Sequence, residues 1–164
     1  MQKLNDIDWP QWKPKERATL LFIIQDGQAL LIHKKRGLGA GNINAPGGRV
    51  EPGETPIQGA IREVQEELCI TPHNVSHCGE LYFQFVDSFS IHCTVFKADS
   101  YTGTPTETDE AIPHWCPLDK IPYDSMWEDD RYWVPLMLEN KIFHGFFLFD
   151  SSRMLDHRID LNQG

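Results

Sequence analysis

The chain has 164 residues, of which 40 % are hydrophobic, and this suffices for one globular domain that buries roughly two thirds of its extended surface. The formal net charge of −9 argues against a protein that grips a nucleic-acid polymer, because affinity for DNA or RNA comes mainly from neutralised phosphates. The sequence has no apolar stretch near the ~20 residues of a membrane span, no signal peptide and no zinc-ligand spacing among its cysteines, so we expect a cytoplasmic monomer that binds no membrane.

Two short apolar runs near the start predict a β-hairpin. They cover residues 19–24 and 29–34, and the polar residues 25–27 separate them. A glycine-rich loop follows at 36–48, where the backbone can approach a ligand without obstruction by Cβ atoms.

The clearest predicted helix runs from 56 to about 68. Thr55 is a good N-cap, Pro56 suits the first helical position, and Gln58 completes a capping box. Apolar residues recur on one face at the 3.6-residue period and would pack on a sheet: Ile57, Ala60, Ile61, Val64 and Leu68. The opposite side carries Arg62, Glu63, Glu66 and Glu67.

The rest of the chain predicts further strands and one more helix. The strands lie at 81–86, 90–97, 111–116 and 142–149, and 101–109 is a polar connection. The second helix lies within 130–140, where Pro135 leaves its first residue undefined. We divide the chain into an N-terminal extension (1–16), one domain (17–150) and a C-terminal tail (151–164). Trp9 and Trp12 in the extension are expected to strap onto the domain surface.

Three glutamates cluster on the first predicted helix. Glu63, Glu66 and Glu67 stand at i, i+3 and i+4, so their side chains are neighbours and repel. A solvated acidic face is the usual explanation for such a cluster. Gly59, however, lies on the same side in the helix interior, where glycine costs about 1 kcal/mol relative to alanine, which indicates a close approach to the backbone. The alternative is half of a metal–phosphate site, because Mg²⁺ is commonly shared between carboxylates and substrate phosphates.

The spacing of these residues resembles the Nudix box. Gly48 is followed after five residues by Glu54, and after seven more by the run REVQEEL at 62–68. Cys69 stands where the family usually has glycine, a helix-ending position that tends to require positive φ. The resemblance implies an α/β protein with the Nudix fold, an α/β/α sandwich around a mixed β-sheet.

The family pattern also implies roles for these residues. A metal, Mg²⁺ or Mn²⁺, would be held by Glu63, Glu66 and Glu67 with the Gly47 carbonyl and Glu110. Glu54 and Arg62 would orient the cluster, since a carboxylate–guanidinium pair can fix a ligand rotamer. Glu67 or Glu63 would take the proton of an attacking water. Glu107 competes with Glu110, but the position of Glu110 after Asp109 and before a strand favours Glu110.

Further motifs lie beyond the box: KKRGLGAG at 34–41, Asn44, Gly47-Gly48, Gly103-Thr104-Pro105, Asp109-Glu110, Met126-Trp127, Asp129-Asp130, Tyr132-Trp133, Pro135 and Phe143-His144-Gly145. With these motifs the chain resembles, over about 19–149, the MutT-type branch of the family, which acts on oxidised purine nucleoside triphosphates. The resemblance implies a substrate site made of Thr19, Lys34, Asn44, Pro46, Phe83, Trp127, Asp129 and Asp130. Trp127 would stack on the base, while the two aspartates would read its edge; helix capping is their alternative role. Leu38 and Ile43 stand where that branch has aromatic residues.

The expected activity is magnesium-dependent hydrolysis of an oxidised purine nucleoside triphosphate, of the 8-oxo-dGTP type, to a nucleoside monophosphate and pyrophosphate. It would sanitise the nucleotide pool. The enzymatic alternative is a general nucleoside triphosphate or dinucleotide pyrophosphohydrolase. A non-catalytic nucleotide-binding module is the alternative from another class, and the intact set of Glu63, Glu66 and Glu67 argues against it.

Overall fold

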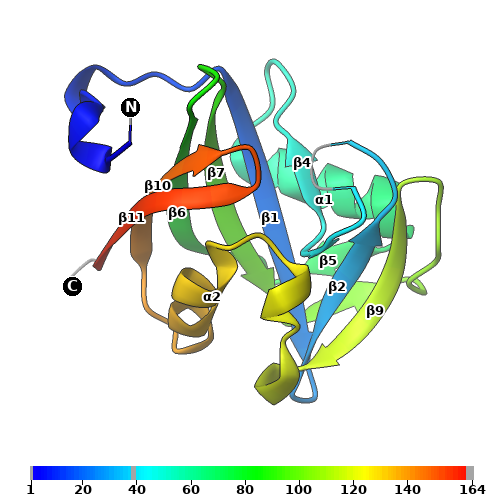
Figure 1. Cartoon of the computed structure of the whole chain (residues 1–164). Helices are drawn as coiled ribbons and strands as arrows, with labels where there is room; N and C mark the ends of the chain where they lie inside the picture. Colours follow the sequence, from blue (N-terminus) through cyan, green and yellow to red (C-terminus); the bar gives the residue numbers. More distant parts are fainter. Residues whose placement is uncertain (1, 38–39, 162–164) are drawn as a thin grey trace.

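A large mixed β-sheet with one α-helix packed on each face forms the body of the protein (Figure 1). The computed structural model describes residues 2–37 and 40–161. Helix α1 (Pro56–Leu68) and helix α2 (Asp130–Leu138) lie on opposite sides of the sheet. This arrangement confirms the predicted α/β/α sandwich around a mixed sheet.

The strands of the large sheet follow the order β11-β10-β6-β7-β1-β2-β3, with β4 paired to β1 and β9 paired to β2. The pairs β1–β7 and β6–β10 are parallel and the other pairs are antiparallel. Strands β5 and β8 form a separate small sheet. The bounds are β1 Glu16–Gln25, β2 Gln28–Lys34, β3 Ile43–Asn44, β4 Gly47–Arg49, β5 Thr71–His73, β6 Ser76–Phe85, β7 Ser90–Ala98, β8 Ser100–Thr102, β9 Ala111–Pro117, β10 Phe143–Asp150 and β11 Arg153–Leu161.

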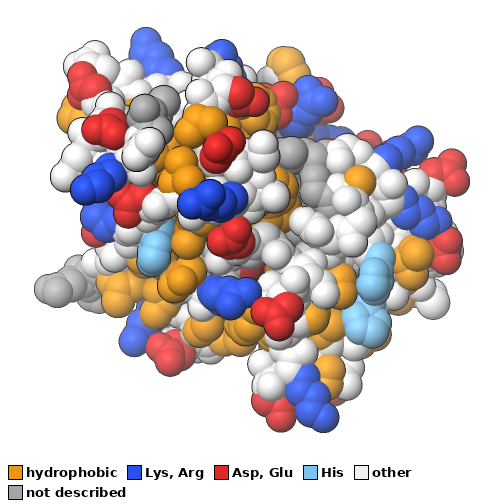
Figure 2. Space-filling model, in the orientation of Figure 1, with side chains coloured by type: hydrophobic (Ala, Val, Ile, Leu, Met, Phe, Trp, Pro, Cys, Tyr) orange, Lys and Arg blue, Asp and Glu red, His pale blue; other side chains and the backbone are white. Residues whose placement is uncertain are grey.

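Alternating side chains of the sheet build two apolar cores. In β1, Leu21 and Ile23 pack with α1 residues such as Val64, whereas Phe22 packs on the other face with Trp133 of α2. Because successive strand residues point to opposite faces, one apolar strand anchors both helices. On the molecular face in Figure 2 the acidic and basic side chains are interspersed, so no single-sign field dominates that face.

A fork between β1 and β2 creates the space for a site. The second half of β1 pairs with β2, but its first half pairs with β4, where Thr19 lies opposite Gly48. Strand β3 pairs with β2, so the segment from β3 to β4 fills the opening between the two long strands. Gly47 is required here, because a Cβ at this position would lie 2.0 Å from the Thr19 carbonyl oxygen.

The local predictions for the hairpin and for α1 are confirmed at their turns and caps. Asp26 and Gly27 form the hairpin turn with φ of 52° and 73°. Thr55 Oγ1 accepts a hydrogen bond from the Gln58 backbone N–H, and Gln58 Oε1 accepts one from the Thr55 N–H, as a capping box requires. Cys69 has φ of 62°, the left-handed conformation expected at the helix end.

Three predictions about packing or extent are wrong. Ile57 does not pack on the sheet, because 38 % of it is exposed in the first turn of α1. The polar connection predicted at 101–109 begins later than residue 101, since β8 extends to Thr102 and pairs with β5. The segment assigned as a C-terminal tail contains β11, which pairs along β10 and carries the sheet past residue 150.

The described helices include none that is long and apolar enough to cross a membrane.

Candidate active site

A pocket of about 160 Å³ opens at the fork between β1 and β2. Its lining includes seven of the residues expected to bind substrate, namely Thr19, Lys34, Asn44, Phe83, Trp127, Asp129 and Asp130. Pro46 is not among the described lining residues; it lies in the turn between β3 and β4, and its carbonyl accepts a hydrogen bond from the Leu21 N–H. The sheet therefore gathers residues that are far apart in the sequence.

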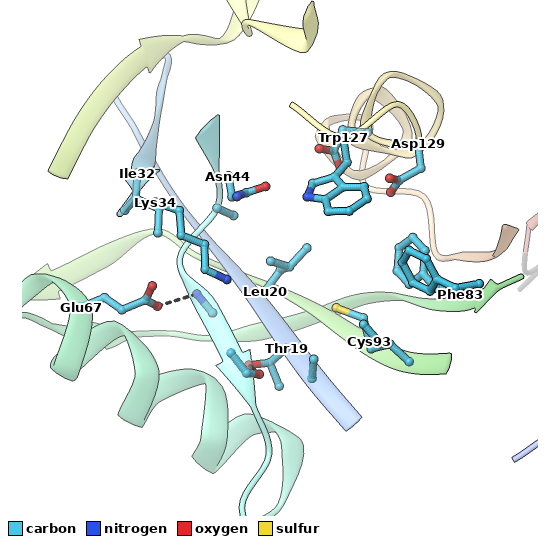
Figure 3. A pocket seen from close by; sticks show the side chains of 17 residues that line it. Thr19, Leu20, Ile32, Lys34, Asn44, Glu67, Phe83, Cys93, Trp127 and Asp129 are labelled. Atoms are coloured by element: carbon cyan, nitrogen blue, oxygen red, sulfur yellow. Dashed lines mark hydrogen bonds between the residues drawn. The ribbon is translucent and has the colours of Figure 1, made fainter. Parts of the chain in front are cut away.

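The two ends of the pocket differ in chemistry (Figure 3). Glu67 from α1 and Lys34 from β2 lie at one end, whereas Trp127 and Asp129 lie at the other beside Phe83. The pocket can therefore hold a molecule with a charged part near α1 and a flat apolar part near α2.

Glu67 is the buried carboxylate of the charged end, with only 4 % of its surface exposed. It accepts a hydrogen bond of 2.8 Å from the Gly47 N–H. Burial raises the pKa of Glu67 to about 8, although the Gly47 hydrogen bond opposes the shift. Burial also raises the pKa of Glu63, against the opposing effect of the Arg62 guanidinium. Both shifts arise mainly because burial disfavours the charged form of a carboxylate.

Arg62 holds Glu54, in the loop before α1, and Glu63 and Glu66 of α1 in place. Its Nε and Nη2 donate to the two oxygens of Glu54 at 2.6 and 3.0 Å, and this pairing holds the pKa of Glu54 below its usual value. Nη1 donates to Glu63 at 3.0 Å and to Glu66 at 3.2 Å. Nη2 also donates to the Arg49 carbonyl, which ties the cluster to β4. These hydrogen bonds join Glu54, Glu63 and Glu66 into one network around the Arg62 guanidinium.

The close packing around the cluster explains why glycine stands at positions 48 and 59. A Cβ on Gly48 would lie 2.5 to 2.7 Å from the carboxylate atoms of Glu63. A Cβ on Gly59 would lie 3.0 Å from Glu54 Oε1 and 3.5 Å from Val50 Cα. The glycine in the helix interior therefore admits the loop that carries Glu54.

Glu107 and Glu110 both lie in the loop before β9, and Glu110 directly precedes the strand. Glu110 pairs with Arg36 at 2.7 Å, and Glu107 pairs with Lys35 at 2.5 Å. Thr108 Oγ1 donates to the Glu67 carbonyl at 2.7 Å, so the loop is anchored to the end of α1. Among the causes that raise the pKa of Glu67 and Glu63, burial comes first and the charge of Glu110 is a smaller contribution to each. That contribution places Glu110 within electrostatic reach of the cluster.

The donor chemistry of the cluster fits a hard divalent cation, but the side chains are not arranged around one. In the described part of the chain, no three carboxylate, imidazole or thiol groups converge as metal ligands. Glu63 and Glu66 turn toward Arg62, Glu67 turns toward Gly47, and Glu110 turns toward Arg36. Carboxylate oxygens are the ligands that Mg²⁺ prefers, and the raised pKa of buried Glu67 marks a position where a cation would be stabilising.

The other end of the pocket holds two adjacent buried acids. Asp129 and Asp130 are 2 % and 6 % exposed. Asp129 makes no side-chain capping bond to α2; instead it accepts a 2.8 Å hydrogen bond from Trp133 Nε1. Burial raises the pKa of Asp129 to about 6 and raises that of Asp130 well above its usual value, with the charge of Asp129 as the second cause for Asp130. The capping alternative for Asp129 is therefore wrong.

Several pocket residues could not be assigned from the sequence alone. Leu20, Ile91 and Cys93 line the pocket between its two ends. Phe83 lies opposite Ile91 in the β6–β7 ladder, so the register of this hairpin would have pointed to Ile91. Leu38 lies outside the described residues, and Ile43 is buried in the core on the α2 side.

Residues 14–137 match the family profile described as the NUDIX domain. The chain belongs to the Nudix family. It is 42 % identical over 146 residues to the oxidized purine nucleoside triphosphate hydrolase of Danio rerio, covering 87 % of this chain and 92 % of the relative. It is also 42 % identical over 145 residues to the protein of that name from Mus musculus, covering 86 % and 92 %. The crystal structure of a MutT protein from Bacillus halodurans superimposes with a TM-score of 0.80 at 25 % identity, covering 88 % of this chain and 97 % of that one.

Proposed function

We propose that this Nudix protein hydrolyses oxidised purine nucleoside triphosphates to the monophosphate and pyrophosphate, and so clears them from the nucleotide pool. The observation that carries the proposal is one continuous pocket with Glu67 of the Nudix box at one end and Trp127 with two buried acids at the other. The names of the zebrafish and mouse relatives support the same substrate class.

We propose Mg²⁺ as the metal, since the donors at the charged end are carboxylate oxygens. Glu63, Glu66 and Glu67, with the Gly47 carbonyl and Glu110, would hold it. When bound, it would polarise the phosphates and lower the pKa of the attacking water.

The side chains of the charged end perform the remaining tasks. Arg62 fixes the rotamers of Glu54 and Glu63 through its hydrogen bonds. Lys34, which lines the same end, offers an ammonium group to the phosphates. Glu67 accepts the proton of the water on its carboxylate, which must be ionised to do so, and a cation bound beside it would favour that ionised form.

Asp129 and Asp130 would select the base through their protonation. Two adjacent buried acids do not both ionise easily, so one of them stays neutral near pH 7. A neutral acid donates a hydrogen bond to a carbonyl such as a purine O6, whereas a carboxylate accepts one from a ring N–H or an amino group. The pair can therefore recognise the edge of an oxidised purine.

The test is a pyrophosphate-release assay with magnesium over 8-oxo-dGTP, dGTP, a pyrimidine triphosphate and a dinucleoside polyphosphate. We expect the highest kcat/KM for 8-oxo-dGTP. Comparable values for all four substrates would favour the general pyrophosphohydrolase, and nucleotide binding without turnover would favour a binding module.

The role of the acid pair is tested with Asp130→Asn. We expect kcat/KM for 8-oxo-dGTP to fall by ~10–100-fold, because Asn cannot exchange a proton with Asp129 and so removes the ionised form of Asp130 that accepts from a base N–H. The magnesium concentration for half-maximal rate should not change. If all substrates lose activity equally, the aspartates do not read the base.

We also propose that the protein is a cytoplasmic monomer. The cysteines Cys69, Cys78, Cys93 and Cys116 are free thiols, as expected in a reducing compartment. Size-exclusion chromatography with light scattering would test the monomer.

A further inference from the structure

The N-terminal strap, which we define as residues 4–15, lies against the face of β6, β10 and β11 that points away from the pocket (Figure 1). It contains the short 3-10 turns Leu4–Asp6 and Trp9–Gln11. Leu4 is 5 % exposed, and its N–H donates to Asp156 of β11 at 2.9 Å. The Trp9 ring packs edge-on against Phe146 of β10, with 5.0 Å between centroids. The strap is therefore docked along its length.

Two hydrogen bonds join the strap to the β6–β7 hairpin. Trp12 Nε1 donates to Gln84 Oε1 at 2.8 Å, and the Lys15 N–H donates to Ser90 Oγ at 2.9 Å. Gln84 and Ser90 lie opposite each other as the last paired residues before the hairpin turn. The strap thus contacts both strands at the point where the turn begins.

The Gln84 side chain that accepts from Trp12 also donates hydrogen bonds to the turn. Its amide Nε2 donates to the Phe85 carbonyl at 2.8 Å and to the Phe89 carbonyl at 3.1 Å. The same two carbonyls accept the backbone hydrogen bonds that close the turn, from the N–H groups of Ser88 and Phe85 respectively. A side chain held by Trp12 therefore braces the backbone of the turn.

The opposite face of this hairpin is a wall of the pocket. Phe83, Phe85, Ile91 and Cys93 line it. The Phe85 ring lies 6.3 Å from the Trp127 ring and 5.7 Å from that of Phe149, centroid to centroid. Because side chains alternate between faces, the backbone that carries Gln84 and Ser90 outward carries Phe85 and Ile91 inward.

We propose that the N-terminal strap positions the base-binding wall of the pocket, acting from Trp12 through Gln84 to Phe85 and Ile91. Trp12 and Gln84 are positioning residues, since they face away from the pocket. This inference rests on the proposed function, because it takes the Trp127 end as the place where the base binds. It adds to that function a specificity element that lies outside the pocket.

The test compares two identical substitutions in the strap. Trp12→Phe removes the N–H that reaches Gln84, whereas Trp9→Phe removes an N–H that has no hydrogen-bond partner in the described structure. We expect Trp12→Phe to raise KM for 8-oxo-dGTP by about 3–10-fold, the effect of losing one hydrogen bond. kcat and the magnesium requirement should stay within about twofold, and Trp9→Phe should leave KM unchanged.

A second variant, Gln84→Glu, separates the two halves of the link. It keeps an oxygen that can accept from Trp12 but loses the amide that donates to the two turn carbonyls. We expect a rise in KM at least as large as in Trp12→Phe, and less than additive effects in the double variant.

The outcomes distinguish a failure of the strap proposal from a failure of the proposed substrate. The proposal is overturned if KM is unchanged in both Trp12→Phe and Gln84→Glu. It is also overturned if Trp9→Phe and Trp12→Phe raise KM by the same factor and both lower Tm, since the effect would then come from a general loss of stability. If the wild type prefers another triphosphate, the proposed substrate is wrong, and the same KM ratios measured with the preferred triphosphate still decide the role of the strap.

Discussion

Arg62 is the residue on which the geometry of the charged end depends. One guanidinium contacts Glu54, Glu63 and Glu66, as well as the carbonyl of Arg49. A lysine would offer a point charge without the planar fork that binds both oxygens of Glu54. Glu67 is the carboxylate of the α1 cluster that Arg62 does not contact, and its hydrogen bond comes from the Gly47 backbone. Glu67 can therefore change its protonation without breaking a hydrogen bond to Arg62.

Glu67→Gln should separate chemistry from folding. We expect turnover at saturating magnesium to fall by ~10²–10⁴-fold, because glutamine cannot accept the proton of the water. The Tm of the metal-free protein should not fall, since the amide oxygen can still accept from Gly47 and the burial of a charge is avoided. Glu139→Gln, an exposed change after α2, is the control and should leave both quantities unchanged. Near-normal turnover in Glu67→Gln would show that the assigned base is wrong.

Glu110 and Glu107 provide a matched pair for the fifth ligand position. Each makes one ion pair, to Arg36 and Lys35, and the two side chains are 44 % and 57 % exposed. Removing either of these surface ion pairs should lower the free energy of unfolding by a similar ~0–1 kcal/mol. Glu110→Gln should nevertheless reduce kcat/KM by about 10-fold or more, the usual cost of disturbing a metal shell, while Glu107→Gln should not. Equal small effects on kcat/KM would mean that another group completes the shell.

At the scale of the element, the end of α1 shows how one residue departs from its family without loss of the fold. Cys69 adopts φ of 62°, and its N–H still closes the helix by donating to the Gln65 carbonyl. The left-handed conformation costs a residue with a Cβ roughly 1–2 kcal/mol relative to glycine. The left-handed conformation at Cys69 ends the helix and lets its N–H satisfy a carbonyl of the last turn, which offsets part of this cost.

Cys69→Gly should therefore stabilise the protein. We expect the free energy of unfolding to rise by about 0.5–1 kcal/mol, since the greater freedom of glycine in the unfolded chain offsets part of the relieved strain. Chemical denaturation measures the change, and kcat should be unaffected. Cys69→Ala keeps the strain and should show no such gain; a gain of equal size in both variants would trace the effect to the thiol instead.

At the scale of the whole molecule, the sequence predicted what is local and left out what depends on assembly. Thr55, Pro56 and Gln58 define the start of α1 within four residues, so a capping box is visible in the sequence alone. The fork is not visible, because β3 and β4 are too short to show a period and exist only where β1 and β2 diverge. Strand β11, RMLDHRIDL, carries charges at the sheet edge, so it lacks the alternation that marks a half-buried strand.

The site also has one part that the sequence predicts from local spacing and another that depends on how the strands assemble. The carboxylates of α1 are close in sequence, and their helical spacing predicts the cluster. The base end requires β6, β7 and the segment before α2 to meet, and nothing in the sequence near Ile91 or Cys93 indicates that they line the same pocket as Trp127. Only the register of the β6–β7 hairpin places them there.

The buried acid pair should make the stability of the whole protein depend on pH. Burial holds the pKa of Asp129 at about 6, and that of Asp130 well above its usual value of 3.8. In this range the folded state binds more protons than the unfolded state, so stability is fully present below about pH 4 and falls as pH rises through the folded pKa values. A shift of about two units corresponds to a loss on the order of 3 kcal/mol for Asp129.

Asp130→Asn tests this dependence, because an amide resembles the neutral acid and does not ionise. In metal-free, nucleotide-free buffer, we expect the variant to lose less stability than the wild type between pH 5 and pH 8. Its Tm relative to wild type should therefore be higher at pH 8 than at pH 5. The matched control is Asp119→Asn, an exposed aspartate beyond β9, which should shift the curve by the same small amount at both pH values. Parallel Tm curves for wild type and Asp130→Asn would show that Asp130 titrates alike in the folded and unfolded chain, and would also remove the physical basis for a neutral hydrogen-bond donor at the base.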